Sequence, residues 1–214
     1  MTAATSPAFA AQVTPKPLGF DPAKLNGLSE QLIRSHWENN YGGSVKALAV
    51  VKKQLAEALE SKDTPPYVYN DLKREHLMRT GSVVLHELYF DNLGGDGNSD
   101  AAMQTALANA FGAYDVWETE FRRIGLGLGG GSGWVVLGYN IHVGQIENYW
   151  LWDHLHGPPA TMPLLVMDMY EHSYQMDFGA ATAKYIDAFF QNIRWEAVLA
   201  RFEQARQFAS GKQS

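Results

Sequence analysis

Cysteine is absent from the 214-residue sequence, so neither disulfide bonds nor thiolate ligands are available to the protein. Any metal ion must therefore be bound by His, Asp or Glu side chains. Long hydrophobic runs are also missing, because none approaches the ~18 consecutive apolar residues that are needed to span a membrane. We therefore expect no membrane association.

Positive charge is scarce, with 17 Lys and Arg against 23 Asp and Glu and a formal net charge of −6. This balance argues against a general nucleic-acid binder or a protein attached to anionic membranes. An anionic substrate would need a local positive field, such as a metal centre. The hydrophobic content of 46% is ordinary for a soluble globular protein, and the length allows one domain or two small ones.

The N-terminal segment Met1–Val13 is rich in Ala and lacks the basic start of a secretory signal peptide. Within it, Ala8-Phe9-Ala10 resembles a signal-peptide cleavage site. We expect a cytoplasmic protein, or a periplasmic one if Met1–Val13 is the remnant of an export signal. Residues 1–26 as a whole are interpreted as an extended N-terminal arm.

Residues 27–95 are predicted to form a helical hairpin domain. The first helix begins at Ser29, a typical N-cap, and its apolar residues follow helical spacing. Gly42-Gly43 interrupts this spacing and predicts a kink or break. The Pro-containing turn 62–66 cannot continue a helix, and a second helix is expected over about 69–90. Two long helices joined by such a turn favour an antiparallel hairpin.

Residues 96–214 are predicted to form a C-terminal α/β domain, because the Gly- and Asn-rich segment 92–98 marks a boundary. One helix is expected over roughly 101–124. The glycine-rich run 125–133 follows that helix and precedes a strand. Because it lacks the Lys-Ser/Thr of a phosphate-binding loop, we expect no phosphate site there.

Three apolar segments after residue 133 predict a small sheet. Two of them, 134–137 and 142–149, read as paired strands with a turn at Gly138-Tyr139-Asn140, and 163–167 is the third. Helical segments close the chain. The predicted class is α+β, with an N-terminal antiparallel helical hairpin followed by a mixed domain whose small three-stranded antiparallel sheet is flanked by helices.

The apolar run 163–167 leads directly to Asp168, and His172 follows four residues later. A carboxylate at a strand end and an imidazole at this spacing can point at one spot, and a metal ion needs such a pair. The alternative for Asp168 is a helix cap. His36, on the apolar face of the first helix, and His86, near the end of the second, are each either hydrogen-bonded core residues or ligands.

A resemblance to the iron/manganese superoxide dismutase family adds to this reading. The residues that carry it are Gly27-Leu28-Ser29-Glu30 with His36, His86-Glu87-Leu88-Tyr89-Phe90, Gly131-Ser132-Gly133-Trp134, and Asp168 with Glu171-His172 and Tyr174. These motifs stand in the family's order, at nearly its spacing, from about Pro17 to Phe202. The resemblance implies a helical hairpin followed by a mixed domain, which agrees with the fold predicted above.

The resemblance implies one iron or manganese ion per subunit, with His36, His86, Asp168 and His172 as its ligands. The implied reaction converts superoxide to dioxygen and hydrogen peroxide while the ion alternates between +3 and +2. His154 stands where the family supplies a Gln or His that bonds the metal-bound solvent, and here the chain resembles the mycobacterial type. His156, two residues away, is the alternative for this role.

Several positions depart from the family pattern. Ser44 stands where a Tyr gates the substrate funnel, and Tyr170 replaces the usual Trp beside the ligands. Tyr174 keeps its family identity and is counted with Ser44 and His154 among the catalytic residues that the resemblance implies. Because the ligand set is intact while its surroundings are changed, the rival function is a non-enzymatic or altered-activity metal-binding homologue on the same fold.

The resemblance also implies a homodimer, or a dimer of dimers, with Glu171 and His172 at the interface. Asn40 and Gln175 replace a His and a Tyr that bond across that interface in the family. A second rival is a mononuclear iron oxygenase that uses two His and one carboxylate, but a third His would fill the coordination positions that such an enzyme keeps open. The sequence does not choose between iron and manganese.

Overall fold

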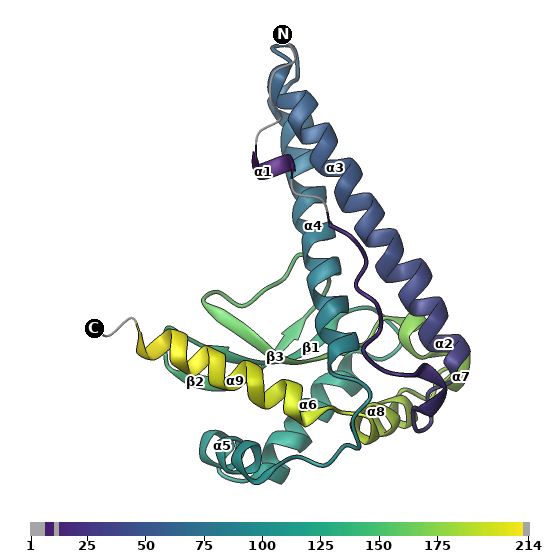
Figure 1. The fold of residues 1–214 in the computed structure, drawn as a ribbon, viewed down its shortest axis with the longest axis vertical. Coiled ribbons are helices and arrows are strands. Elements are labelled where there is room, and N and C mark those ends of the chain that lie inside the picture. Colours follow the sequence, from purple (N-terminus) through teal and green to yellow (C-terminus); the bar gives the residue numbers. More distant parts are fainter. Residues whose placement is uncertain (1–6, 11–12, 212–214) are drawn as a thin grey trace.

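The computed structural model describes residues 7–10 and 13–211. Two long helices, α3 and α4, lie side by side and project from a wider part that holds the sheet and the remaining helices (Figure 1). The N-terminal arm contributes α1 (Pro7–Ala10) and the short 3₁₀ helix η1 (Pro22–Lys24). The segment Met1–Val13, considered above as the remnant of an export signal, lies largely outside the described residues.

The first long helical segment begins where the sequence predicts. The Ser29 hydroxyl accepts a hydrogen bond from the Leu32 amide at 3.1 Å and caps α2 (Glu30–Ser35). A π-helical turn, η2 (His36–Tyr41), follows, and α3 (Gly42–Glu60) continues from it.

The break expected at Gly42-Gly43 was wrong, because the helix runs through both glycines. A helical Gly costs only ~1 kcal/mol relative to Ala, and the apolar face of α3, with Val45 and Leu48, packs into the core. The irregularity lies one turn earlier, in η2. Wide turns of this kind are often found at functional sites, and this one begins at His36.

The second long helix is α4 (Pro66–Asp91), which pairs with α3 as the predicted hairpin. It starts three residues earlier than expected, because Pro66 is tolerated in the first turn of a helix. Not all of its apolar residues face the core, since Leu77 and Val84 are 54% and 46% exposed.

The single helix expected over roughly 101–124 was also wrong. The structure has α5 (Ala101–Phe111) and α6 (Tyr114–Leu128) instead. Gly112 separates them with a φ of 88°, a backbone conformation that glycine adopts without the steric cost other residues incur. The start of the glycine-rich run, from Gly125, belongs to α6.

The predicted three-stranded antiparallel sheet is confirmed, in the order β2-β1-β3. Its strands are β1 (Trp134–Asn140), β2 (Gln145–Leu151) and β3 (Thr161–Asp168). The turn expected at Gly138-Tyr139-Asn140 was wrong, because these residues pair with both neighbouring strands. The actual turn follows Asn140, whose side-chain oxygen accepts hydrogen bonds from the amides of His142 and Val143.

After β3 the chain forms the 3₁₀ helix η3 (Glu171–Ser173), α7 (Gln175–Phe178), α8 (Thr182–Gln191) and α9 (Trp195–Ser210). Helices α4 and α9 contact β3, and α6 contacts β1. The predicted α+β class is therefore confirmed. Among the described residues, no helix is both long and apolar enough to cross a membrane.

Candidate metal centre

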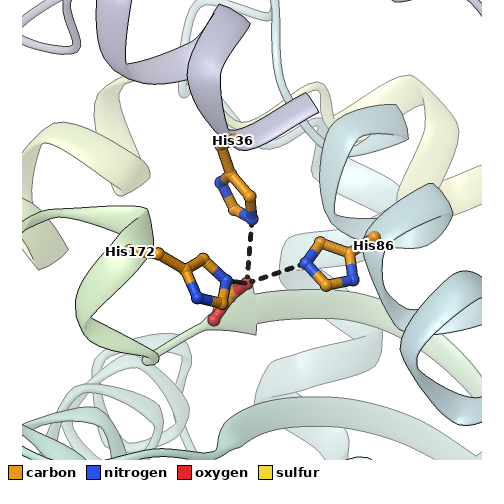
Figure 2. Close-up of side chains that lie close together, drawn as sticks. His36, His86 and His172 are labelled. Atoms are coloured by element: carbon orange, nitrogen blue, oxygen red, sulfur yellow. Dashed lines mark hydrogen bonds and ion pairs between the residues drawn. The ribbon is translucent and has the colours of Figure 1, made fainter. Parts of the chain in front are cut away.

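Four side chains from four separate elements meet between the helical hairpin and the sheet (Figure 2). His36 opens η2, His86 lies in α4, Asp168 ends β3 and His172 lies in η3. One potential ligand atom from each residue lies within 4.8 Å of the other three. The sequence prediction that these four residues come together is thus matched by their positions.

The Asp168 carboxylate is the centre of this cluster. Its Oδ2 atom lies 3.1 Å from Nε2 of His36, 3.6 Å from Nε2 of His86 and 3.3 Å from Nε2 of His172. The side chains of His36, His86 and Asp168 are at most 1% exposed, whereas that of His172 is 26% exposed. Three imidazole nitrogens therefore face one carboxylate oxygen in an interior that excludes most water.

Burial shapes the protonation of the cluster. It lowers the pKa of His36 and lowers that of His86 to about 3. Burial alone would raise the pKa of Asp168, but the close approach of His172 and His36 to the carboxylate brings it below its usual range. These shifts favour neutral imidazoles at His36 and His86 and an ionised carboxylate, which are the forms that bind metal ions.

Unsatisfied nitrogens show that the cluster fits a bound cation. The Nε2 atoms of His36 and His86 are buried, and neither makes a hydrogen bond of acceptable geometry. Leaving a buried polar group without a partner costs ~1–3 kcal/mol. A metal ion beside Asp168 Oδ2 would accept the lone pairs of these nitrogens. Three imidazoles and a carboxylate suit a transition metal rather than calcium or magnesium, which prefer oxygen ligands.

Hydrogen bonds to the side-chain carboxylate and to the backbone carbonyl of Asp168 hold this residue in place. Its side-chain Oδ1 accepts from the Tyr170 amide at 2.8 Å, so Asp168 caps the following turn while Oδ2 faces the imidazoles. Its backbone oxygen accepts from the hydroxyls of Tyr185 at 2.7 Å and Ser173 at 2.9 Å. The two carboxylate oxygens therefore have different surroundings: Oδ1 makes a local turn contact with Tyr170, and Oδ2 faces the three imidazoles.

A buried amide sets β3 against the end of α4. The side-chain oxygen of Asn92, which follows α4, accepts a hydrogen bond from the Val166 amide at 2.9 Å. Asn92 is fully buried. This bond places the end of β3, which carries Asp168, beside the last turns of α4, which carry His86.

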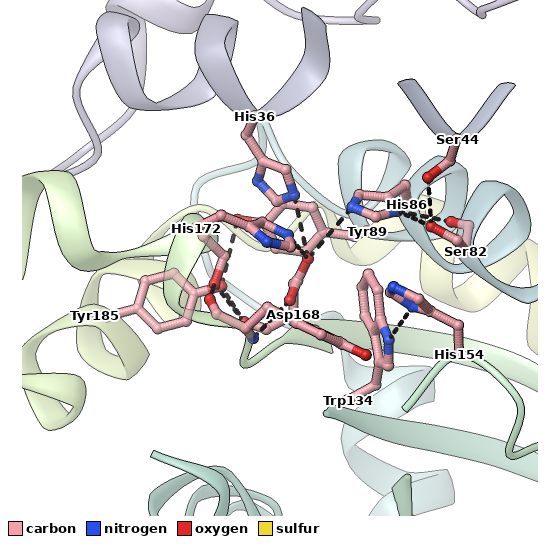
Figure 3. A network of polar contacts seen from close by, with 12 residues as sticks. His36, Ser44, Ser82, His86, Tyr89, Trp134, His154, Asp168, His172 and Tyr185 are labelled. Atoms are coloured by element: carbon pink, nitrogen blue, oxygen red, sulfur yellow. Dashed lines mark hydrogen bonds and ion pairs between the residues drawn. The ribbon is translucent and has the colours of Figure 1, made fainter. Parts of the chain in front are cut away.

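His86 is oriented by its own helix. Its Nδ1 atom lies 2.7 Å from the carbonyl oxygen of Ser82, one turn earlier. A carbonyl only accepts, so Nδ1 carries the proton and Nε2 presents its lone pair to the cluster. The hydroxyl of Ser82 also lies 3.3 Å from Nδ1 and 2.8 Å from the hydroxyl of Ser44 (Figure 3).

His154 lies at the edge of the cluster. The Trp134 indole N–H donates to His154 Nδ1 at 3.0 Å, and because an indole can only donate, neutral His154 carries its proton on Nε2. The Tyr170 ring stacks on His154 at 4.7 Å and on His172 at 5.3 Å. His156 is exposed and contacts Asp153 at 2.9 Å. Of the two histidines left open above, the structure therefore brings only His154 next to the cluster.

The other residues named from the family resemblance take different places. Tyr174 is buried, but its hydroxyl accepts from the Gly130 amide at 3.0 Å, so the structure does not direct that group at the cluster. Ser44 is buried and bonded to Ser82. Glu171 and Gln175 are exposed and Asn40 is half-buried in the single chain.

Two residues near the His86 ring, Ser82 and Tyr41, were not found by sequence reasoning. Ser82 stands four residues before His86, and this spacing, which places side chains on one face of a helix, was an available signal. Tyr41 is the other. Its hydroxyl donates to Glu87 at 2.9 Å and accepts from the Lys16 amide at 2.8 Å, which ties the N-terminal arm to the hairpin. No local pattern distinguishes Tyr41 from an ordinary apolar helix residue.

Three imidazoles and a carboxylate, gathered where a helical hairpin meets a small antiparallel sheet, define a candidate mononuclear metalloprotein. Residues 99–201 match the family model for iron/manganese superoxide dismutases, C-terminal domain. An iron superoxide dismutase of Cupriavidus metallidurans is 52% identical over 190 residues, which cover 89% of this chain and 96% of that protein.

More distant relatives are superoxide dismutases as well. An iron superoxide dismutase of Aquifex aeolicus is 35% identical, over 86% of this chain and 88% of that protein. A manganese superoxide dismutase of Haloferax volcanii is 28% identical, over 91% of this chain and 96% of that protein. The chain belongs to the iron/manganese superoxide dismutase family, and the expectation of a superoxide dismutase is confirmed.

Proposed function

We propose that the protein dismutates superoxide at one iron or manganese ion bound by His36, His86, Asp168 and His172. The observation that carries this proposal is the convergence of three imidazole Nε2 atoms on Asp168 Oδ2, with two of the nitrogens buried and otherwise without partners. When bound, the ion supplies the redox step by alternating between its +3 and +2 states.

The protein's own residues would set the charge and the proton supply of the site. Neutral imidazoles cancel none of the metal's charge and the carboxylate cancels one unit, so the site would stay positive inside a chain of net charge −6. That local field would attract anionic superoxide. His154, held by Trp134 with its proton on Nε2, would offer a hydrogen-bond donor beside the ligands.

The proposed assembly is a homodimer, with the option of a dimer of dimers. It is supported by the partial exposure of the ligand His172 and by the exposed Glu171 next to it. In a dimer, Glu171 would accept a hydrogen bond from the partner subunit's His172. Asn40 and Gln175 would lie near the same interface.

The test combines metal analysis with a dismutation assay on protein loaded with iron or with manganese. We expect rapid superoxide loss with at least one metal, and sharply reduced occupancy when any of His36, His86, Asp168 or His172 is changed to Ala. His142→Ala is the matched control, because His142 is exposed in the turn after β1. Full occupancy in a variant excludes that residue as a ligand, and full occupancy of the wild type without dismutation would favour the non-enzymatic homologue.

A further inference from the structure

Two buried serines face each other across the contact between α3 and α4, next to His86 (Figure 3). Ser44 Oγ lies 2.8 Å from Ser82 Oγ, and the two residues are 6% and 1% exposed. Ser82 Oγ lies 3.3 Å from His86 Nδ1. The serine pair therefore reaches the imidazole at the nitrogen that does not face Asp168.

The directions of these hydrogen bonds follow from the groups involved. His86 Nδ1 lies 2.7 Å from the Ser82 carbonyl, which can only accept, so the Nδ1–H group is the donor. The Ser82 hydroxyl then acts as a second acceptor for the same N–H. Its bond to Ser44 holds it in this position, whichever of the two hydroxyls donates. One imidazole N–H thus has two oxygen acceptors, and the second is anchored on the neighbouring helix.

We propose that Ser44 and Ser82 form a positioning pair for His86, which holds the ring plane and strengthens Nε2 as a metal ligand. This inference rests on the ligand role proposed above for His86. Hydrogen bonding to the far nitrogen of a ligating histidine orients the ring and raises its basicity, and losing such a partner commonly changes metal affinity by ~10- to 100-fold. Because the Ser82 hydroxyl shares the N–H with a carbonyl, we expect its removal to weaken metal binding by ~10-fold, the lower end of this range.

A packing role makes a different prediction. Two buried hydroxyls can satisfy only each other, in which case their removal would change protein stability and leave the bound metal unaffected. The two roles also differ in coupling. In the positioning role Ser44 acts only through Ser82, so the effects of removing the two hydroxyls on metal binding cannot be independent.

The experiment uses Ser82→Ala, Ser44→Ala and the double variant of the full chain. Thr80→Ala is the matched control, because it removes a hydroxyl from the same helix. That hydroxyl donates to the His76 carbonyl at 2.8 Å rather than contacting His86. The measurements are the Mn²⁺ affinity, by competition with a chelator, and the electron paramagnetic resonance and visible spectra of the loaded proteins. The wild type is measured first, with His86→Ala as the ligand control.

The positioning role predicts ~10-fold weaker binding and an altered spectrum for Ser82→Ala. It predicts a smaller change in the same direction for Ser44→Ala, a double variant no worse than Ser82→Ala, and wild-type behaviour for Thr80→Ala. Unchanged affinity and spectra in the serine variants, or a further loss from Ser44→Ala when Ser82 is already Ala, would overturn it.

Two further outcomes are also decisive. If Ser82→Ala does not fold, Ser44→Ala decides alone, because it keeps the contact between Ser82 and His86 and removes only the anchor of that contact. An altered spectrum then supports the pair, and an unchanged one refutes it. A wild type that binds no ion, or a His86→Ala variant that binds normally, would refute the ligand role of His86 and this inference with it, whereas failure of the serine variants alone leaves the proposed function standing.

Discussion

The backbone of α4 at Gly81 lies directly against the backbone of His154. A Cβ atom built on Gly81 would stand 1.9 Å from the His154 carbonyl oxygen and 3.0 Å from its carbonyl carbon. Only a residue without a side chain allows this approach. The segment that carries His154 can therefore lie on the helix that carries His86, and the two rings are 5.9 Å apart.

Gly81→Ala should force these backbones apart. Alanine is the better helix former by ~0.5–1 kcal/mol, but overpacking of a tight contact typically costs ~1–3 kcal/mol. We therefore expect a lower free energy of unfolding, measured by urea titration, together with reduced dismutation because His154 moves. Gly43→Ala in α3 is the matched control, since its Cβ would meet no atom within 4 Å, and it should be neutral or stabilising. Equal unfolding free energies and equal activities in the two variants would show that the close contact at Gly81 contributes nothing to stability or to the position of His154.

His154→Gln should change dismutation with iron and with manganese by unequal factors. The change replaces the N–H donor beside the metal site, which shifts the reduction potential, and the two metals start from different potentials. Partners of this kind commonly alter activity by ~10- to 100-fold. His156→Gln, at an exposed residue paired with Asp153, should have no effect. Equal changes with both metals, or none, would count against a tuning role for His154.

Glu171→Ala should convert the proposed dimer into monomers. The variant removes the acceptor proposed for the partner subunit's His172 and leaves a ligand-bearing imidazole without its partner. Sedimentation velocity at micromolar concentration measures the result directly. Glu60→Ala, at the exposed end of α3, serves as the control of equal charge change. A Glu171→Ala protein that sediments like the wild type would place the dimer contact elsewhere.

Asn40 and Gln175 should be energetically coupled across the proposed dimer interface. Each carries an amide that donates and accepts, and a neutral hydrogen bond contributes ~0.5–1.5 kcal/mol net. Asn40→Ala alone should therefore leave the dimer assembled. A double-mutant cycle on the dimer dissociation constant should show a coupling of that size. If the effects of the two substitutions on the free energy of dissociation were strictly additive, the two amides would not be in contact.

Asp91→Ala should destabilise the contact between α4 and α9. The Asp91 carboxylate accepts hydrogen bonds from Arg194 and Arg201, and Arg201, with a side chain 14% exposed, also donates to the Leu164 carbonyl at 2.6 Å. Because Asp91 itself is half exposed, we expect a loss of only about 1–2 kcal/mol in the free energy of unfolding.

A surface pair provides the control for Asp91→Ala. Glu57 and Lys53 are both largely exposed, and their charged atoms are 3.8 Å apart. Glu57→Ala should leave the unfolding midpoint unchanged, because solvent screens such pairs. If Asp91→Ala also left the unfolding midpoint unchanged, solvent and backbone groups alone would be enough to satisfy the hydrogen bonds of the two arginines.

The sequence alone determined the features that depend on local pattern. Apolar spacing and the turn 62–66 specify the α3–α4 hairpin, and the Ser29 cap places its start. The apolar run before Asp168 specifies a strand that ends at that residue. Local pattern left His36 and His86 open between core residues and ligands, and it was the resemblance to the superoxide dismutase family that selected the four residues that meet in the structure.

The tertiary structure decided the features where local preferences are weak and a distant partner outweighs them. Gly42-Gly43 stays helical because a local cost of ~1 kcal/mol for each glycine is smaller than the stabilisation from packing α3 on α4. Gly138 lies in a strand because Glu147 and Pro163 pair with it from both sides.

The surroundings of the proposed ligands were decided in the same way. His154 rather than His156 reaches the cluster because Trp134, twenty residues earlier, donates to it. Ser44 and Ser82 meet only because α3 and α4 are packed together. The family motifs thus selected the ligand candidates, whereas several of the hydrogen bonds around them depend on contacts between segments that are distant in the chain, and no local pattern encodes those contacts.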